Sequence, residues 1–176
     1  MKSSLLIILS FFYSLVYCHE LIPLKVGNSW TYEQKTIFKD GTIKIDTVVN
    51  EVLRDTLIAG ETWYVLREFG DEFIVKNEDG NQFEYWEEAT LFYKNPEKSL
   101  GEKYKVGEFT LIEIAKEIVK IHNFHGNNKC YHYSIFEEEL EIPIIQVFIA
   151  PELGVVHHSW LIDGHVIESQ LIDFKL

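Results

Sequence analysis

Residues 23–32 read PLKVGNSWTY, and they begin the first strand expected in this chain of 176 residues. Gly27 and Asn28 form a pair that accepts positive φ angles and therefore suits a turn. Trp30 and Tyr32 follow two residues apart, a spacing that places both side chains on one face of a β-strand. We therefore expect these two aromatic residues to be the first anchors of a hydrophobic core.

The rest of the chain repeats the pattern of short strand and tight turn. Asp-Gly pairs, which are typical of hairpin turns, begin at Asp40, Asp79 and Asp163. The segments between turns are rich in β-branched and aromatic residues. The sequence therefore predicts an all-β protein with a single antiparallel, strongly curled sheet of about ten strands. Such a sheet forms a half-open barrel or a clam-like fold. The clearest expected strands cover residues 29–37, 42–53, 62–69, 72–77, 82–87, 90–94, 129–136, 144–150, 155–162 and 165–175.

Two segments are ambiguous at this level. In the expected strand 42–53 the apolar face changes at the adjacent residues Val48 and Val49, which predicts a β-bulge or strong coiling at this point. Residues 109–122 read FTLIEIAKEIVKIH and fit a helix with one apolar side. The isoleucines and the surrounding strands favour a β-strand for the same residues, and we adopt the strand with the helix as the alternative.

The N-terminal residues 1–18 have the pattern of a secretory signal peptide, with Lys2 ahead of an apolar run too short to span a bilayer comfortably. Residues 19–176 then form one β-rich domain, because no low-complexity linker divides them. Cleavage directly after Cys18 is favoured. The alternatives are a lipid-modified Cys18, for which Tyr17 is a poor fit, and a disulfide between Cys18 and Cys130.

Charge excludes several classes of partner. The chain has 28 acidic and 16 basic side chains and a net charge of −12 at pH 7. Nucleic acids and anionic lipid surfaces attract basic proteins, so neither is an expected partner. Contact with a membrane is expected only through an N-terminal lipid, if Cys18 carries one.

Histidine and cysteine offer only weak candidates for chemistry. His122, Cys130 and His132 have ligand types that zinc prefers, but their spacing matches no established zinc motif. Cys130 and His132 could also pair as nucleophile and base, although no orienting third group follows from the sequence. We therefore expect no bound metal, no cofactor and no enzymatic activity.

Aromatic residues are the remaining signal, at 14% of the chain. Most aromatic strand residues fill a core. A sheet that curls without closing would also expose some of them on a concave apolar face, which suits a hydrophobic ligand. The residues that we assign to such a binding face are Trp30, Tyr32, Trp63, Tyr85, Trp86, Tyr93, Phe148 and Trp160.

Two motifs together resemble a recurrent exported domain of Bacteroidetes-type bacteria. That family begins with PLxVGNxWxY, as residues 23–32 do, and ends with an APxxG corner and a hairpin, as residues 150–154 (APELG) do. Glu152 departs from the family, in which the corner more often reads Pro-Gly. The resemblance implies a half-open barrel similar in kind to periplasmic carriers of lipids and lipoproteins, and it carries no catalytic residues.

These observations predict an exported protein of the bacterial envelope, either periplasmic or at the cell surface. The first interpretation is a monomeric, non-enzymatic binding module for a hydrophobic small molecule or a lipoprotein segment. The second is a structural or adhesive module that binds an envelope protein. The third, a metal-dependent enzyme, would need the histidines to converge on one point.

Overall fold

The structure is a computed structural model, and it describes residues 20–107, 110–123, 126–137 and 140–176. These residues form thirteen β-strands and one short helix, α1 (Pro96–Ser99). The strands in chain order are β1 (Ser29–Ile37), β2 (Ile43–Ile58), β3 (Glu61–Glu68), β4 (Asp71–Glu78), β5 (Asn81–Tyr85), β6 (Ala89–Tyr93), β7 (Lys103–Val106), β8 (Thr110–Ile114), β9 (Val119–Asn123), β10 (Gly126–Glu137), β11 (Ile145–Ala150), β12 (Gly154–Ile162) and β13 (His165–Lys175).

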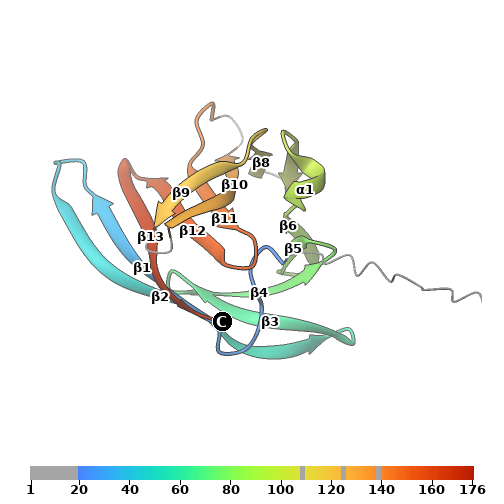
Figure 1. Cartoon of the computed structure of the whole chain (residues 1–176). Helices are drawn as coiled ribbons and strands as arrows, with labels where there is room; N and C mark the ends of the chain where they lie inside the picture. The colour runs from blue at the N-terminus through green and yellow to red at the C-terminus, as the bar shows by residue number, and fades with distance from the viewer. Residues whose placement is uncertain (1–19, 108–109, 124–125, 138–139) are drawn as a thin grey trace, which may run out of the picture.

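All of these strands belong to one antiparallel sheet that curls into a nearly closed barrel (Figure 1). The strand order is β6-β5-β4-β3-β2-β1-β13-β12-β11-β10-β8-β7, with β9 paired to β10 outside this path. Strands neighbouring in sequence are therefore mostly neighbours in space, as short hairpin connections require. The predicted all-β, curled antiparallel sheet is confirmed, with thirteen described strands where about ten were expected.

The ambiguous segment 109–122 accounts for part of this difference. Its described residues form β8 and β9, so the strand interpretation is confirmed and the helix alternative is wrong. Ile112 and Ile114 of β8 are fully buried, whereas Ile118, which follows the end of β8, is 45% exposed. Burial of Ile112 and Ile114, which are two residues apart, thus favours the two-residue repeat of a strand over the 3.6-residue repeat of a helix.

The bulge lies four residues beyond the position that the sequence predicted. Strands β1 and β2 pair without interruption through Val48 and Val49, and the register between β2 and β3 shifts at Leu53. The prediction of a bulge at the valine pair is wrong, and Val49 is exposed to solvent, at 45%. An apolar residue on the outer face of a strand needs no break in the ladder.

The turn between β3 and β4 is formed by Phe69 and Gly70, one residue earlier than the expected Gly70-Asp71. Phe69 has a φ of 49°, a left-handed value that is uncommon for a bulky residue. Its backbone N–H donates to Oδ1 of Asn50 at 2.8 Å, and its ring stacks on His158 with centroids 4.8 Å apart. Tertiary contacts therefore hold Phe69 in a conformation that local propensity disfavours.

Trp30 and Tyr32 anchor the core, as the spacing in the first strand predicts. Their side chains are 2% and 1% exposed. Indole Nε1 of Trp30 donates to the carbonyl of Leu153 at 2.6 Å, and the Tyr32 hydroxyl donates to the carbonyl of Val155 at 2.9 Å. Both hydrogen bonds span 123 residues of sequence, so they connect the first strand to the start of β12.

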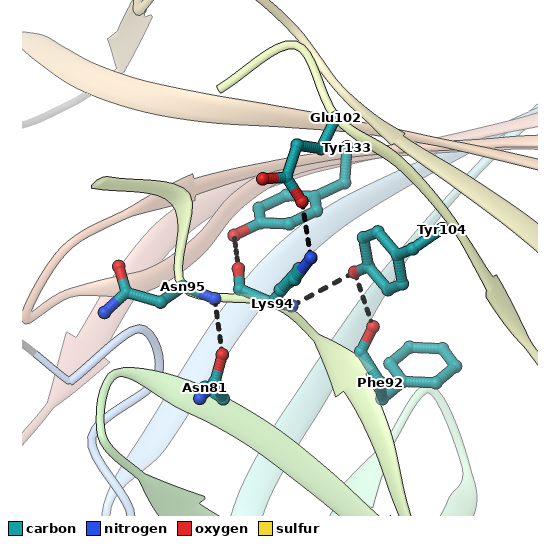
Figure 2. A network of polar contacts seen from close by, with 7 residues as sticks. All are labelled: Asn81, Phe92, Lys94, Asn95, Glu102, Tyr104 and Tyr133. Atoms are coloured by element: carbon teal, nitrogen blue, oxygen red, sulfur yellow. Dashed lines mark hydrogen bonds and ion pairs between the residues drawn. The ribbon is translucent and has the colours of Figure 1, made fainter. Parts of the chain in front are cut away.

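The two ends of the sheet, β6 and β7, share no backbone ladder among the described residues. Side chains bridge this seam instead (Figure 2). The Tyr104 hydroxyl donates to the carbonyl of Phe92 at 2.7 Å and accepts the backbone N–H of Lys94 at 3.0 Å. The Tyr133 hydroxyl donates to the carbonyl of Lys94 at 3.0 Å, and the Lys94 ammonium pairs with Glu102. The barrel is thus closed by tyrosine hydroxyls rather than by strand pairing.

Replacing Tyr104 by phenylalanine tests this closure. We expect the free energy of unfolding to fall by about 1–1.5 kcal/mol, because the change removes both hydrogen bonds of the half-buried hydroxyl. Hydrogen exchange of the Lys94 amide should accelerate in the variant, as measured by NMR. Tyr85→Phe is the control, since its hydroxyl has no hydrogen-bond partner among the described residues; equal exchange rates in the two variants would contradict the seam.

Candidate functional site: a cavity inside the curled sheet

A cavity of about 300 Å³ lies inside the sheet, between β3–β6 on one side and β10–β12 on the other. This volume is at the lower end of the range for sites that hold small molecules. Most of the surrounding side chains are apolar. The lining residues are Leu66, Glu68, Phe69, Asp71, Phe73, Val75, Gln82, Glu84, Trp86, Phe92, Tyr93, Ile135, Ile145, Val147, His158 and Trp160.

The cavity reaches solvent on the side of Trp86 and Asp71. Trp86 lines the cavity and is nevertheless 72% exposed, and Asp71 is also exposed. Val75 and Val147, by contrast, are 5% and 2% exposed and line its interior. The site is therefore an apolar pocket with a mouth, and a tryptophan stands at that mouth.

Strand β5 contributes polar residues to the cavity because of its pairing register. Glu84 pairs with Val75, and Val75 pairs with Tyr64 of β3, so these three side chains share the inner face of the sheet. Gln82, two residues before Glu84, shares that face, and both line the cavity. Phe83 pairs with Lys76 on the opposite, outer face. The aromatic residues inside β5 thus point away from the cavity.

Two carboxyl groups are placed in these apolar surroundings. Burial, and to a smaller extent the nearby Glu84 carboxylate, together raise the pKa of Glu68 to about 7. Burial also raises the pKa of Glu84, and a hydrogen bond from Trp86 partly offsets this effect. Within the described part of the chain, no hydrogen bond or ion pair offsets the burial of Glu68 or its repulsion from Glu84. No lysine or arginine lines the cavity to neutralise either group.

Two further polar atoms in the cavity wall have no hydrogen-bond partner among the described residues. They are the amide nitrogen Nε2 of Gln82 and the ring nitrogen Nδ1 of His158, and both atoms are buried. Gln82 is only 4% exposed. Burial, and to a smaller extent His157, together lower the pKa of His158 to about 4, so the His158 ring is neutral at pH 7. Buried polar atoms are usually satisfied, so two such atoms in one cavity indicate a site made to receive a polar group.

The eight aromatic residues predicted for ligand binding lie in four places. Trp86, Tyr93 and Trp160 line the cavity. Trp30 and Tyr32 belong to the core and lie outside the cavity lining. The remaining residues, Trp63, Tyr85 and Phe148, lie elsewhere on the sheet.

Trp63 and Tyr85 pack against each other on the outer face, with ring centroids 5.4 Å apart. The Lys76 ammonium lies 5.0 Å from the Trp63 ring centroid and pairs with Glu61 and Glu78, so a charged side chain covers the cluster. Trp63 is consequently buried, at 2% exposure, without belonging to the core inside the barrel.

Phe148 lies in a second, more polar hollow between β9 and the strands β11–β13. Its ring stacks on His132, with centroids 4.3 Å apart, and packs at a tilt of 58° against His157, with centroids 5.4 Å apart. His122 and His157 both line this hollow. Within the described residues, no three histidine, cysteine or acidic side chains converge closely enough to hold a metal ion.

Cys130 is fully buried, and its thiol donates to the carbonyl of Asn128 at 3.5 Å. Burial raises the pKa of Cys130 to about 11, which keeps the thiol protonated and unreactive at neutral pH. Nε2 of His132 lies 3.3 Å from the Ser134 hydroxyl. Cys130 therefore has the environment of a core residue and not that of a nucleophile.

Sequence reasoning missed Glu68, Gln82, Glu84 and His158 as residues of the site. The alternating segment 82–86 (QFEYW) places Phe83 and Tyr85 on one face and Gln82 and Glu84 on the other. Alternation alone does not say which face is internal, and the more apolar face is the usual choice. In the structure the more apolar face of this segment is the outer one, where the Lys76 side chain covers the aromatic rings of Trp63 and Phe83.

Cys18 and the expected signal peptide, residues 1–18, lie outside the described residues. Within the described ranges, no helix combines the length and the apolar composition that a membrane crossing requires.

Comparison with known proteins places the fold. No protein-family model matches the chain, and no curated protein does so. Two crystal structures are similar. One is a Bacteroides fragilis protein described as exported and as having a YmcC-like fold, with 13% identity, a TM-score of 0.55 and coverage of 90% of this chain and 100% of that one. The other is a Parabacteroides distasonis protein described as a lipoprotein, with 12% identity, a TM-score of 0.50 and coverage of 90% and 99%. At these identities the comparison establishes a shared fold, and this chain is similar over nearly its whole length to a curled sheet of the YmcC-like kind.

Proposed function

We propose that this protein is an exported, non-enzymatic envelope protein that holds a hydrophobic small molecule inside its curled sheet. The observation that carries the proposal is the apolar cavity with its open mouth at Trp86. A void of this size in a folded domain lacks the contacts that close packing supplies, so it costs stability unless a ligand fills it. One structural relative is described as an exported protein and the other as a lipoprotein, which supports an exported location for this chain.

The cavity predicts binding of an uncharged apolar probe. N-phenyl-1-naphthylamine becomes fluorescent in apolar surroundings, and we expect saturable binding to the full chain. Ile145→Trp places a larger side chain at a half-buried position in the cavity wall. We expect this variant to bind the probe at least tenfold more weakly, because the added volume replaces the ligand's.

Ile45→Trp is the matched control. Ile45 lies on β2, is 62% exposed and does not line the cavity, so the same substitution there should leave probe affinity unchanged. Circular dichroism establishes that both variants are folded. Equal probe binding by wild type and Ile145→Trp would refute the cavity as the binding site.

A module that binds an envelope protein is the second candidate. It is favoured by an exposed apolar row on β2, in which Ile43, Ile45 and Val49 are 53%, 62% and 45% exposed. These residues share one face of the strand because they are separated by even numbers of residues. Absence of any probe binding in the wild-type protein would leave this candidate as the better one.

A further inference from the structure

We propose that the ligand of this cavity is a cationic amphiphile, with an amine or quaternary ammonium head beside Glu68 and Glu84 and an apolar tail among the interior side chains. The inference rests on the proposed function and adds the class of head group. It follows from the charges and the unsatisfied polar atoms of the lining.

The lining has a strong excess of negative groups. Glu68, Asp71 and Glu84 all line the cavity, and no lysine or arginine does. An unpaired carboxylate in apolar surroundings costs several kcal/mol, and a bound cation offsets that cost. An anionic head group, such as that of a free fatty acid, would instead add a third negative charge next to two. Charge therefore favours a cation and disfavours an anion.

The aromatic residues at the site are compatible with the same head group. Trp86 and Trp160 line the cavity together with Tyr93. Tryptophan faces attract amines and quaternary ammonium groups, especially when the cation is removed from water. Trp86 donates a hydrogen bond to Glu84, which places an aromatic ring and a carboxylate side by side near the mouth.

An independent observation points to a bound molecule. Gln82 is 4% exposed, lines the cavity, and its amide Nε2 has no partner among the residues described. His158 also lines the cavity, and its buried ring nitrogen Nδ1 has no hydrogen-bond partner among the described residues either. An unsatisfied donor two residues from Glu84 favours a head group that carries an oxygen close to its positive charge.

The titratable groups around the site set the pH range of the test. Burial keeps the tyrosine hydroxyls near the cavity protonated, since it raises the pKa of Tyr32 and of Tyr93 well above the usual value. His158 is neutral above about pH 5 because its pKa is lowered to about 4. Between pH 5 and pH 8 the Glu68 carboxyl, whose pKa is about 7, is therefore the group of the lining whose change of charge the test follows.

The experiment compares three probes that have the same tail. Decyltrimethylammonium, decanol and decyl sulfate carry a permanent positive charge, no charge and a permanent negative charge, and none of them titrates in this range. Isothermal titration of the full chain at pH 8 should show the cation binding at least tenfold more tightly than decanol. Decyl sulfate should bind more weakly than decanol. Lowering the pH to 5.5 should weaken cation binding about tenfold, because the Glu68 carboxyl takes up a proton, and should leave decanol binding unchanged.

Variants separate the local carboxylates from the net charge of the whole protein. Glu84→Gln and Glu68→Gln should each weaken binding of decyltrimethylammonium about tenfold and leave decanol binding unchanged. Glu33→Gln removes the same charge from an exposed position of β1 and should change neither affinity. A general effect of the acidic surface would make all three variants equal, and that result would overturn the proposal.

The outcomes also distinguish this inference from the proposed function. Binding of decanol or decyl sulfate as tight as that of the cation would refute the cationic head group and leave the hydrophobic site intact. Failure of all three probes to bind would refute both. Cation binding that survives Glu68→Gln and Glu84→Gln together would place the head group elsewhere.

Discussion

Replacement of Trp30 by alanine is expected to lower the free energy of unfolding by about 3–5 kcal/mol, the usual cost of removing a large buried aromatic side chain. Trp30 is 2% exposed, and its indole is the partner of the Leu153 carbonyl, so the change creates a cavity and leaves a buried acceptor unsatisfied. Urea unfolding followed by circular dichroism measures the difference.

Leu57→Ala is the control, because Leu57 is 73% exposed on β2, does not line the cavity, and its truncation should alter stability by no more than about 0.5 kcal/mol. Trp30→Phe provides a milder change in case the alanine variant does not fold. It keeps most of the volume and removes the hydrogen bond to Leu153, at an expected cost of about 1–2 kcal/mol. Equal stabilities of Trp30→Ala and Leu57→Ala would contradict the role of Trp30 as the core anchor.

Replacement of Glu68 by glutamine is expected to stabilise the protein at pH 8 by about 2 kcal/mol. The pKa of Glu68 is about 7 in the folded protein and near 4.5 in an unfolded chain. Above pH 7 the folded protein must hold an ionised, half-buried carboxylate close to Glu84, and glutamine removes that cost. The expected gain is less than the full pKa shift corresponds to, because water partly screens a half-buried group.

The sign of the pH dependence follows from the raised pKa. Between about pH 4.5 and pH 7 the folded state binds more protons than the unfolded state, so the contribution of Glu68 to stability declines as the pH rises. The difference between Glu68→Gln and wild type should therefore nearly vanish at pH 4.5 and reach its full value at pH 8. Glu33→Gln, at an exposed position, should show no such trend. A gain of the same size at both pH values would contradict the buried charge.

Glu68→Gln is thus expected to change stability and ligand affinity in opposite directions. The variant should be more stable and should bind a cationic ligand more weakly. A residue that costs stability and serves binding is typical of functional sites. Measuring both quantities on one variant separates this interpretation from a purely structural role for Glu68.

The hairpin strands were predictable because local chemistry and tertiary structure agree in them. The first and last strands, 29–37 and 165–175, were expected with the bounds that the structure has for β1 and β13. Alternating side chains and Asp-Gly turns specify such strands without help from distant residues. The turn at Phe69 could not be predicted, because Asn50 and His158, both far away in the sequence, hold its backbone at positive φ.

The two sequence motifs that first attracted attention form a single structural unit. Gly154, from the second motif, has a φ of 97°, and a Cβ atom there would lie 3.2 Å from Nε1 of Trp30 in the first. A glycine is therefore required both by the backbone conformation and by the close approach of the indole. The two motifs specify how β1 packs against the corner that precedes β12, and both lie outside the cavity lining.

The candidate site was only partly predictable for a related reason. Trp86, Tyr93 and Trp160 line the cavity and belong to a residue class that is enriched in apolar sites, so composition pointed to them. Composition also pointed to five aromatic residues that lie elsewhere, and it did not single out Phe69, Phe73 and Phe92 of the lining. Glu68 and Glu84 resemble the many surface glutamates of an acidic chain. Their place inside the barrel depends on the register of β3, β4 and β5, which the sequence does not reveal.

Native mass spectrometry of the full chain, produced with its own N-terminal segment and purified from a bacterial envelope fraction, tests the central claim most directly. We predict that the wild-type protein and Ile45→Trp carry a non-covalent adduct of lipid size and that Ile145→Trp has lost it. A wild-type protein without any adduct, or an adduct that persists in Ile145→Trp, would contradict a ligand held in the cavity.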